Sequence, residues 1–68
     1  NEVIMYGLGD YVIAFFSKGY KEIVHKCYVG GSYIDLVHER AEKMFYTIPD
    51  AHYYEVFTQE QFKKIGCL

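Results

Sequence analysis

Five side chains of this 68-residue sequence could hold a metal ion or take part in nucleophilic catalysis: His25, Cys27, His38, His52 and Cys67. None of them pairs with the Cys-x2-Cys or His-x3-His spacing that is common in zinc sites. A Cys27 nucleophile with His25 as its base is difficult to arrange, because side chains two residues apart on a strand are separated by about 6.5–7 Å. His38 is the other possible base for Cys27, but no oxyanion-hole pattern accompanies either pair in the sequence. The sequence therefore predicts no catalytic residues, no metal site and no cofactor.

The segment Gly7-Leu8-Gly9 resembles the beginning of a dinucleotide-binding fingerprint. The third glycine of that fingerprint is missing, and a strand-like run follows where a helix is required. We interpret residues 7–10 as a turn, because glycine adopts positive φ without steric cost.

Aromatic residues are the more informative group, since they make up 19% of a chain that is 51% hydrophobic. A domain of this size buries only about 60% of its unfolded surface, so not every ring fits into one core. Tyrosine-rich surfaces are typical of protein interfaces. We therefore predict a protein-binding surface that is formed by Tyr11, Phe15, Tyr20, Tyr28, Tyr53 and Tyr54.

The net charge of −2 argues mildly against nucleic-acid binding driven by a basic surface. Three lysines do gather in one part of the chain: Lys18, Lys21 and Lys26. Together with tyrosines on a sheet they leave single-stranded nucleic-acid binding as an alternative, although Glu22 and Glu55 oppose it.

No apolar run reaches the ~18 residues that a membrane-spanning helix needs, so we expect no membrane association. Two cysteines and no sign of secretion favour free thiols in a reducing compartment, and hence a cytoplasmic protein.

Three strands are predicted in the first half of the chain, at residues 2–6, 11–16 and 21–29. Tight turns between them predict an antiparallel meander, and the pair Gly30-Gly31 is expected to end it. The second strand is apolar at every position, so both of its faces need to be covered.

A helix is predicted over residues 33–46, where Ile34, Val37, Ala41 and Met44 form an apolar stripe. Ser32 and Asp35 have the spacing of a capping box at its beginning, and Pro49 follows its end. A fourth strand is expected at residues 52–57, followed by a short helix that Thr58 and Gln61 cap.

The predicted fold is a single α+β domain over residues 1–68, with the order β-β-β-α-β-α. A right-handed crossover through the long helix would place the fourth strand beside the first, giving the sheet order third-second-first-fourth. The β-β-β-α-β order also begins the ribonuclease H-like fold, but that resemblance is topological only. Nucleases of that fold hold two metal ions with several carboxylates, and residues 3–6 carry none.

These patterns predict a small non-enzymatic interaction module, of the kind found in viruses or mobile elements. We expect it to regulate or inhibit a protein partner, or to form a homodimer, through an aromatic-rich face of the sheet. A small antitoxin-like or single-stranded nucleic-acid-binding domain is the alternative.

Overall fold

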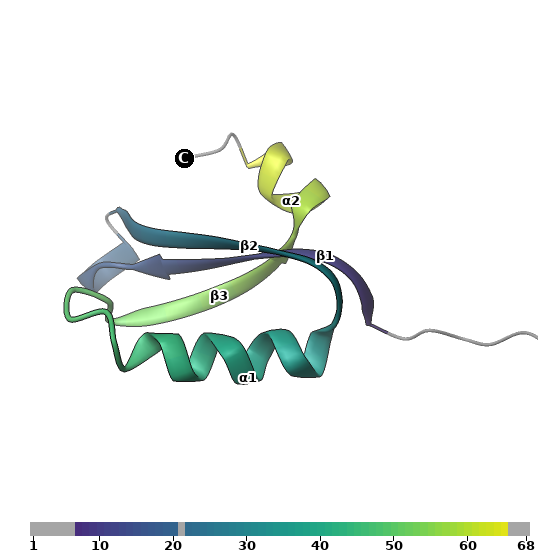
Figure 1. Ribbon diagram of the computed structural model, residues 1–68. Coiled ribbons are helices and arrows are strands. Elements are labelled where there is room, and N and C mark those ends of the chain that lie inside the picture. The colour runs from purple at the N-terminus through teal and green to yellow at the C-terminus, as the bar shows by residue number, and fades with distance from the viewer. Residues whose placement is uncertain (1–6, 21, 66–68) are drawn as a thin grey trace, which may run out of the picture.

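The computed structural model describes residues 7–20 and 22–65 of the chain (Figure 1). The elements follow the order β1 (Leu8–Phe16), a short 3-10 helix η1 (Lys18–Tyr20), β2 (Ile23–Tyr33), α1 (Ile34–Phe45), β3 (Tyr53–Thr58) and α2 (Gln59–Lys64). Figure 1 shows α1 on one side of a three-stranded antiparallel sheet and α2 on the other. The α+β class is therefore confirmed, whereas the strand predicted at residues 2–6 lies outside the described residues.

The sheet has the order β2-β1-β3, with β1 antiparallel to both neighbours. The central residue Ile13 pairs with Cys27 of β2 on one side and with Val56 of β3 on the other. The predicted sheet order, with residues 2–6 between the second strand and the last, is wrong, because β3 pairs directly with β1. The crossover through α1 passes over one strand, so β2 and β3 run parallel to each other on either side of β1.

The strands β1 and β2 extend further than the glycine pattern predicts. Leu8 pairs with Tyr33, and a register shift follows at the point where Asp10 faces both Gly30 and Gly31. The N–H of Gly31 donates to Asp10 Oδ1 at 2.9 Å, and Gly31 has a φ of 57°. The glycine pair therefore forms a β-bulge inside the hairpin instead of ending it.

The helix α1 begins at Ile34 without a side-chain cap. The predicted capping box of Ser32 and Asp35 is wrong, since Ser32 still belongs to β2 and its hydroxyl donates to the Gly30 carbonyl at 3.3 Å. The box predicted at the second helix is confirmed: Thr58 and Gln61 cap α2 reciprocally.

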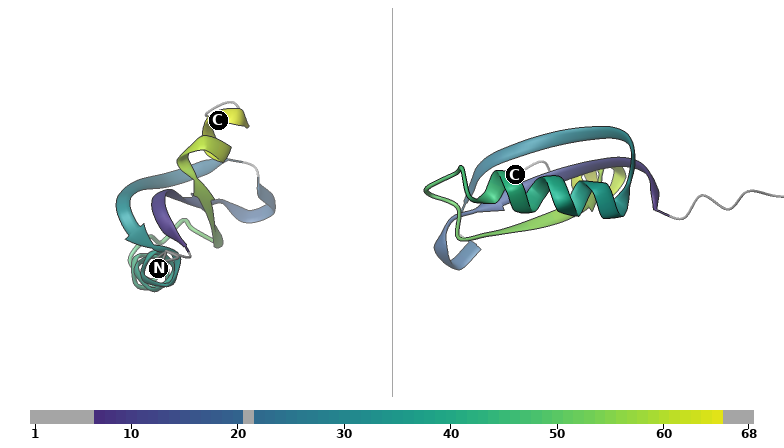
Figure 2. Two further views of the ribbon diagram at one scale, coloured as in Figure 1. Left: turned by 90° about the vertical axis from the view of Figure 1, so that its right-hand side faces the viewer. Right: turned by 60° about the horizontal axis from the view of Figure 1, so that its bottom comes forward.

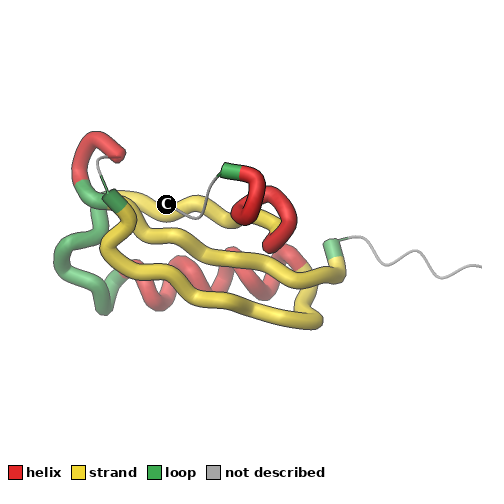
Figure 3. Tube along the Cα trace, turned by 90° about the horizontal axis from the view of Figure 1, so that it is seen from above, coloured by secondary structure: helices red, strands yellow, loops and turns green. Residues whose placement is uncertain are grey.

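The strand β1 is buried on both faces, as its unbroken apolar sequence predicts. One core lies beneath α1 and contains Tyr11, Ile13, Phe15, Val29, Val37 and Ala41. The other lies beneath α2 and contains Val12, Ala14, Phe16 and Phe62. Figure 2 shows the two helices on opposite faces of the sheet, and Figure 3 shows α2 over the sheet at the end where β3 runs into it. Each face of the central strand is thus covered by a helix of the same chain.

Candidate functional site

Two of the six aromatic residues predicted at an interface belong to the core beneath α1. Tyr11 is 8% exposed and Phe15 is 0% exposed. The Tyr11 hydroxyl donates to the Gly7 carbonyl at 2.6 Å, so its polar end is also satisfied within the chain. The expectation that these two rings are exposed is therefore corrected: α1 covers the face of β1 from which they project.

The neighbouring residues Tyr53 and Tyr54 are half-buried on opposite faces of the sheet. Tyr53 stacks on Phe16, with ring centroids 5.3 Å apart and an interplanar angle of 15°. Tyr54 packs against Phe15, His38 and Phe45 at centroid distances of 6.2, 6.3 and 6.1 Å. These tyrosines therefore do not share one surface.

Tyr28 is 58% exposed on the face that carries α2, where its ring meets the edge of Phe62 at 6.4 Å. The side chain of Tyr20 lies outside the described part of the structure. Interface roles for Tyr20, Tyr28, Tyr53 and Tyr54 stay predictions.

The candidate reactive side chains do not converge. The His25 ring on β2 packs against Phe15, with ring centroids 5.9 Å apart. The His38 ring on α1 contacts Tyr54 on β3 instead. Cys27 is a free cysteine, and Cys67 lies outside the described residues. Among residues 7–20 and 22–65, no three His, Cys, Asp or Glu side chains gather in a way that could hold a metal ion.

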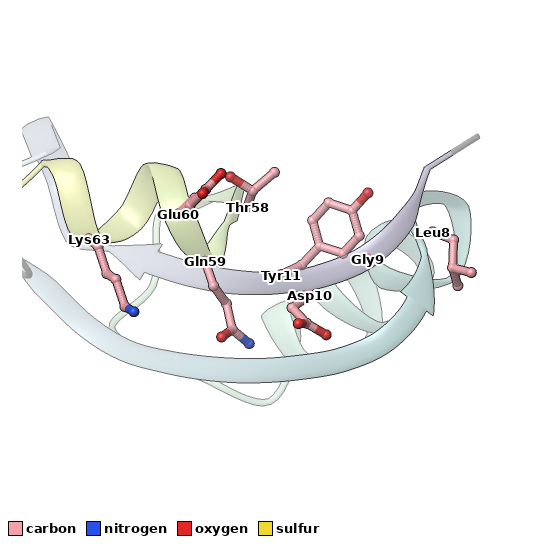
Figure 4. Close-up of a pocket in the computed structure, with 8 residues that line it drawn as sticks. All are labelled: Leu8, Gly9, Asp10, Tyr11, Thr58, Gln59, Glu60 and Lys63. Carbon is pink, nitrogen blue, oxygen red and sulfur yellow. The ribbon is translucent and has the colours of Figure 1, made fainter. Parts of the chain in front are cut away.

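A hollow of about 440 Å³ lies between the beginning of β1 and the beginning of α2 (Figure 4). Three of its polar side chains already serve the fold: Asp10 accepts from Gly31, Tyr11 donates to Gly7, and the Thr58 hydroxyl accepts from the Gln61 N–H. We interpret this hollow as a by-product of the bulge and the cap.

A larger groove, of about 730 Å³, runs along the outer edge of β3. Its lining residues are His38, Tyr54, Glu55, Val56, Phe57, Gln61, Lys64 and Ile65. Four of them are consecutive residues of β3, so the strand edge forms the floor. One wall comes from α1 and the other from α2. Sequence reasoning missed this groove, because it placed residues 2–6 between the second strand and the last, and no local pattern showed which helix residues flank the outer edge of β3.

The backbone of β3 contributes polar groups to the groove. In the described part of the sheet, β3 has a single neighbouring strand, β1. The Thr58 N–H donates to Gln61 Oε1 at 3.0 Å, so it points away from β1. Because backbone groups of a strand alternate in direction, the N–H and C=O groups of Tyr54 and Val56 also face outward. An edge of this kind is a template for another strand.

Charged side chains are separated on the two sides of α1. His38 contacts Tyr54 and so marks the side next to β3. Asp35 and Glu42 lie three residues before and four residues after His38, which places them on the same side of the helix. Arg40 and Lys43 lie two and five residues after His38, a spacing that places them off this side of the helix, and all four of these charged residues are exposed. The side of α1 next to the groove therefore carries two carboxylates beside His38, the helix residue that lines the groove.

No known protein family, curated protein or solved structure matches this chain. In the described residues, no helix is long and apolar enough to cross a membrane.

Proposed function

We propose that this chain is a non-enzymatic protein-interaction module that regulates or inhibits a protein partner by binding it. The groove along β3 is the observation that carries this proposal, because it combines an open strand edge with apolar side chains on both faces of that strand, Tyr54 and Val56 on the α1 side and Phe57 on the α2 side. Main-chain hydrogen bonds to such an edge give affinity, and the flanking side chains select the ligand. The contact surface proposed here is the edge of the sheet, since its central strand is covered on both faces.

Two exposed aliphatic residues, one on α1 and one at the C-cap of α2, allow a matched test. Ile65 lines the groove and is 42% exposed, whereas Leu36 lies outside it and is 58% exposed. We expect Ile65→Asp to abolish capture of a partner from lysate of the source cells and Leu36→Asp to leave it intact. Equal thermal unfolding of the two variants would exclude misfolding. Loss of capture by Leu36→Asp alone would contradict the proposal.

A second candidate function is single-stranded nucleic-acid binding, which we expect of this chain as an alternative to an antitoxin-like role. The observation in its favour is that Lys26 Nζ lies 5.8 Å from the centre of the Phe62 ring, beside the exposed Tyr28. Cations next to aromatic rings suit the stacking of bases. This function requires salt-sensitive binding of a single-stranded oligonucleotide that Tyr28→Ser and Lys26→Gln both weaken. A fluorescence anisotropy titration separates it from the first candidate.

A further inference from the structure

We propose that the groove along β3 takes an extended segment of a partner protein as an added antiparallel strand, with Lys or Arg side chains toward α1 and aliphatic side chains toward α2. This inference rests on the proposed function and specifies the chemistry of the partner. Three features support it: the outward backbone groups of β3, the charged residues on the α1 side of the groove and the apolar residues on the α2 side.

The strand edge sets the pairing. Tyr54 and Val56 face outward with their backbone groups, and both side chains pack with the core beneath α1. Residues that exchange hydrogen bonds across an antiparallel pair have their side chains on the same face of the sheet. The residues of an added strand that bond to Tyr54 and Val56 therefore have side chains on the α1 face.

The α1 wall then selects the type of those side chains. A Lys or Arg there extends its aliphatic stem over Tyr54 and Val56 and brings its charge to Asp35 and Glu42. Both carboxylates are exposed and lie on the side of the helix that faces the groove. An acidic side chain in the same place would be repelled by both.

The α2 wall favours a different chemistry. Phe57 and Ile65 supply apolar surface there, and Lys64 is the cation of that wall. Glu55 lies on the same face, because it pairs with Ala14 of the core beneath α2. A basic side chain on this face would meet both Lys64 and Glu55, so charge selects neither sign there, whereas a Val or Ile side chain would pack on Phe57 and Ile65. The complementary strand is thus basic on one face and aliphatic on the other.

A second copy of this chain is a poorer occupant. Pairing β3 with β3 of another copy about a two-fold axis places the same faces of the two sheets side by side. The acidic sides of the two α1 helices would then face each other across the new strand pair. Like charges in that arrangement oppose self-association, and they favour a foreign basic segment.

Two peptides of about seven residues test the inference, since that length matches an ordinary strand. One is acetyl-Lys-Val-Lys-Val-Lys-Val-Lys-amide, and the other has Glu at every Lys position. Each is titrated into the isotope-labelled full chain at low salt, and the amide shifts of Tyr54 and Val56 are followed by NMR. We expect the lysine peptide to bind with a dissociation constant at least about tenfold lower than that of the glutamate peptide, which corresponds to ~1.4 kcal/mol.

Paired variants test the cause of that preference. Asp35→Asn with Glu42→Gln should remove the difference between the two peptides. The control, Glu22→Gln with Glu60→Gln, changes the net charge equally at two exposed residues outside the groove and should preserve the difference. An equal effect of the two double variants would mean that only net charge matters, and it would overturn the inference.

Methylated peptides test strand addition separately from charge. N-methylation of the lysine residues blocks the amides that face β3 in an antiparallel strand and should abolish binding. N-methylation of the valine residues blocks amides that face solvent, so it removes no hydrogen bond to β3 and should leave binding nearly unchanged. An equal loss with both methylated peptides would overturn the inference.

Three further outcomes would also overturn it. If the glutamate peptide binds as tightly, the partner is not basic, although the proposed function survives. If the β3 amides shift with protein concentration alone, a second copy occupies the groove. If neither peptide shifts these amides at millimolar concentration, no basic strand is added, and the proposed function is then judged by the separate comparison of Ile65→Asp with Leu36→Asp.

Discussion

At the junction of β3 and α2, the side chain of Thr58 and that of Gln61 each accept a hydrogen bond from the other residue's backbone N–H. The Gln61 N–H donates to Thr58 Oγ1 at 3.0 Å, and the Thr58 N–H donates to Gln61 Oε1 at 3.0 Å. This capping box ends the strand, begins the helix and turns the Thr58 N–H away from β1. One pair of residues thus places the α2 wall of the groove next to the strand edge.

The first prediction concerns that junction. Thr58→Ala removes the side-chain acceptor and should lower the free energy of unfolding by about 1 kcal/mol. Thr58→Ser keeps the hydroxyl and should cost much less. Urea denaturation measures both variants. An equal loss in the two would mean that the threonine methyl group, and not the cap, is the stabilising part.

The second prediction concerns the only large apolar side chain that α2 buries within the described residues. Phe62 is 1% exposed and packs against Phe57 at 5.8 Å. Phe62→Ala should lower the free energy of unfolding by about 3–5 kcal/mol, because it leaves a cavity over Val12 and Ala14. Ile65→Ala, at the exposed C-cap residue of the same helix, is the control and should cost far less. A small effect of Phe62→Ala in denaturation would show that α2 does not cover this face of the sheet.

The third prediction concerns the bulge in β2. Gly31 has a φ of 57°, and nothing lies within 4 Å of a Cβ atom placed there. Gly31→Ala should therefore destabilise the chain through backbone conformation alone, by roughly 1–2 kcal/mol. Gly30→Ala is the matched control, because Gly30 does not have a positive φ and its added Cβ would meet only Asp10 Oδ1 at 3.4 Å. Thermal unfolding of the two variants compares them, and the opposite order of stability would contradict this account of the bulge.

Much of the fold could be predicted from local patterns. The spacing of Val37 and Ala41 predicts α1, and these two residues are the buried ones of that helix. The spacing of Thr58 and Gln61 predicts the cap of α2. The apolar run around Ile13 predicts a strand that is covered on both faces. Each of these features depends on neighbours within a few residues in the chain.

The features that sequence reasoning missed depend on distant partners. The pair Gly30-Gly31 predicts the end of a strand when only its neighbours in the sequence are considered. In the fold, Asp10, about 20 residues earlier, accepts the Gly31 N–H, and the strand continues through a bulge. The pairing of β3 with β1 depends on the number of strands that the connection through α1 passes over, and no local sequence pattern predicts that number. The groove follows from that pairing and could not be predicted without it.

Hydrogen–deuterium exchange of the β3 amides tests the central claim, an open strand edge that binds a partner strand, most directly. In the free chain, the outward amides of Tyr54 and Val56 should exchange much faster than those of Glu55 and Phe57, which face β1. Addition of the alternating Lys/Val peptide should slow Tyr54 and Val56 selectively. Equally slow exchange at all four positions in the free chain would mean that the edge is already occupied, by residues 1–6 or by another copy, and would contradict the account.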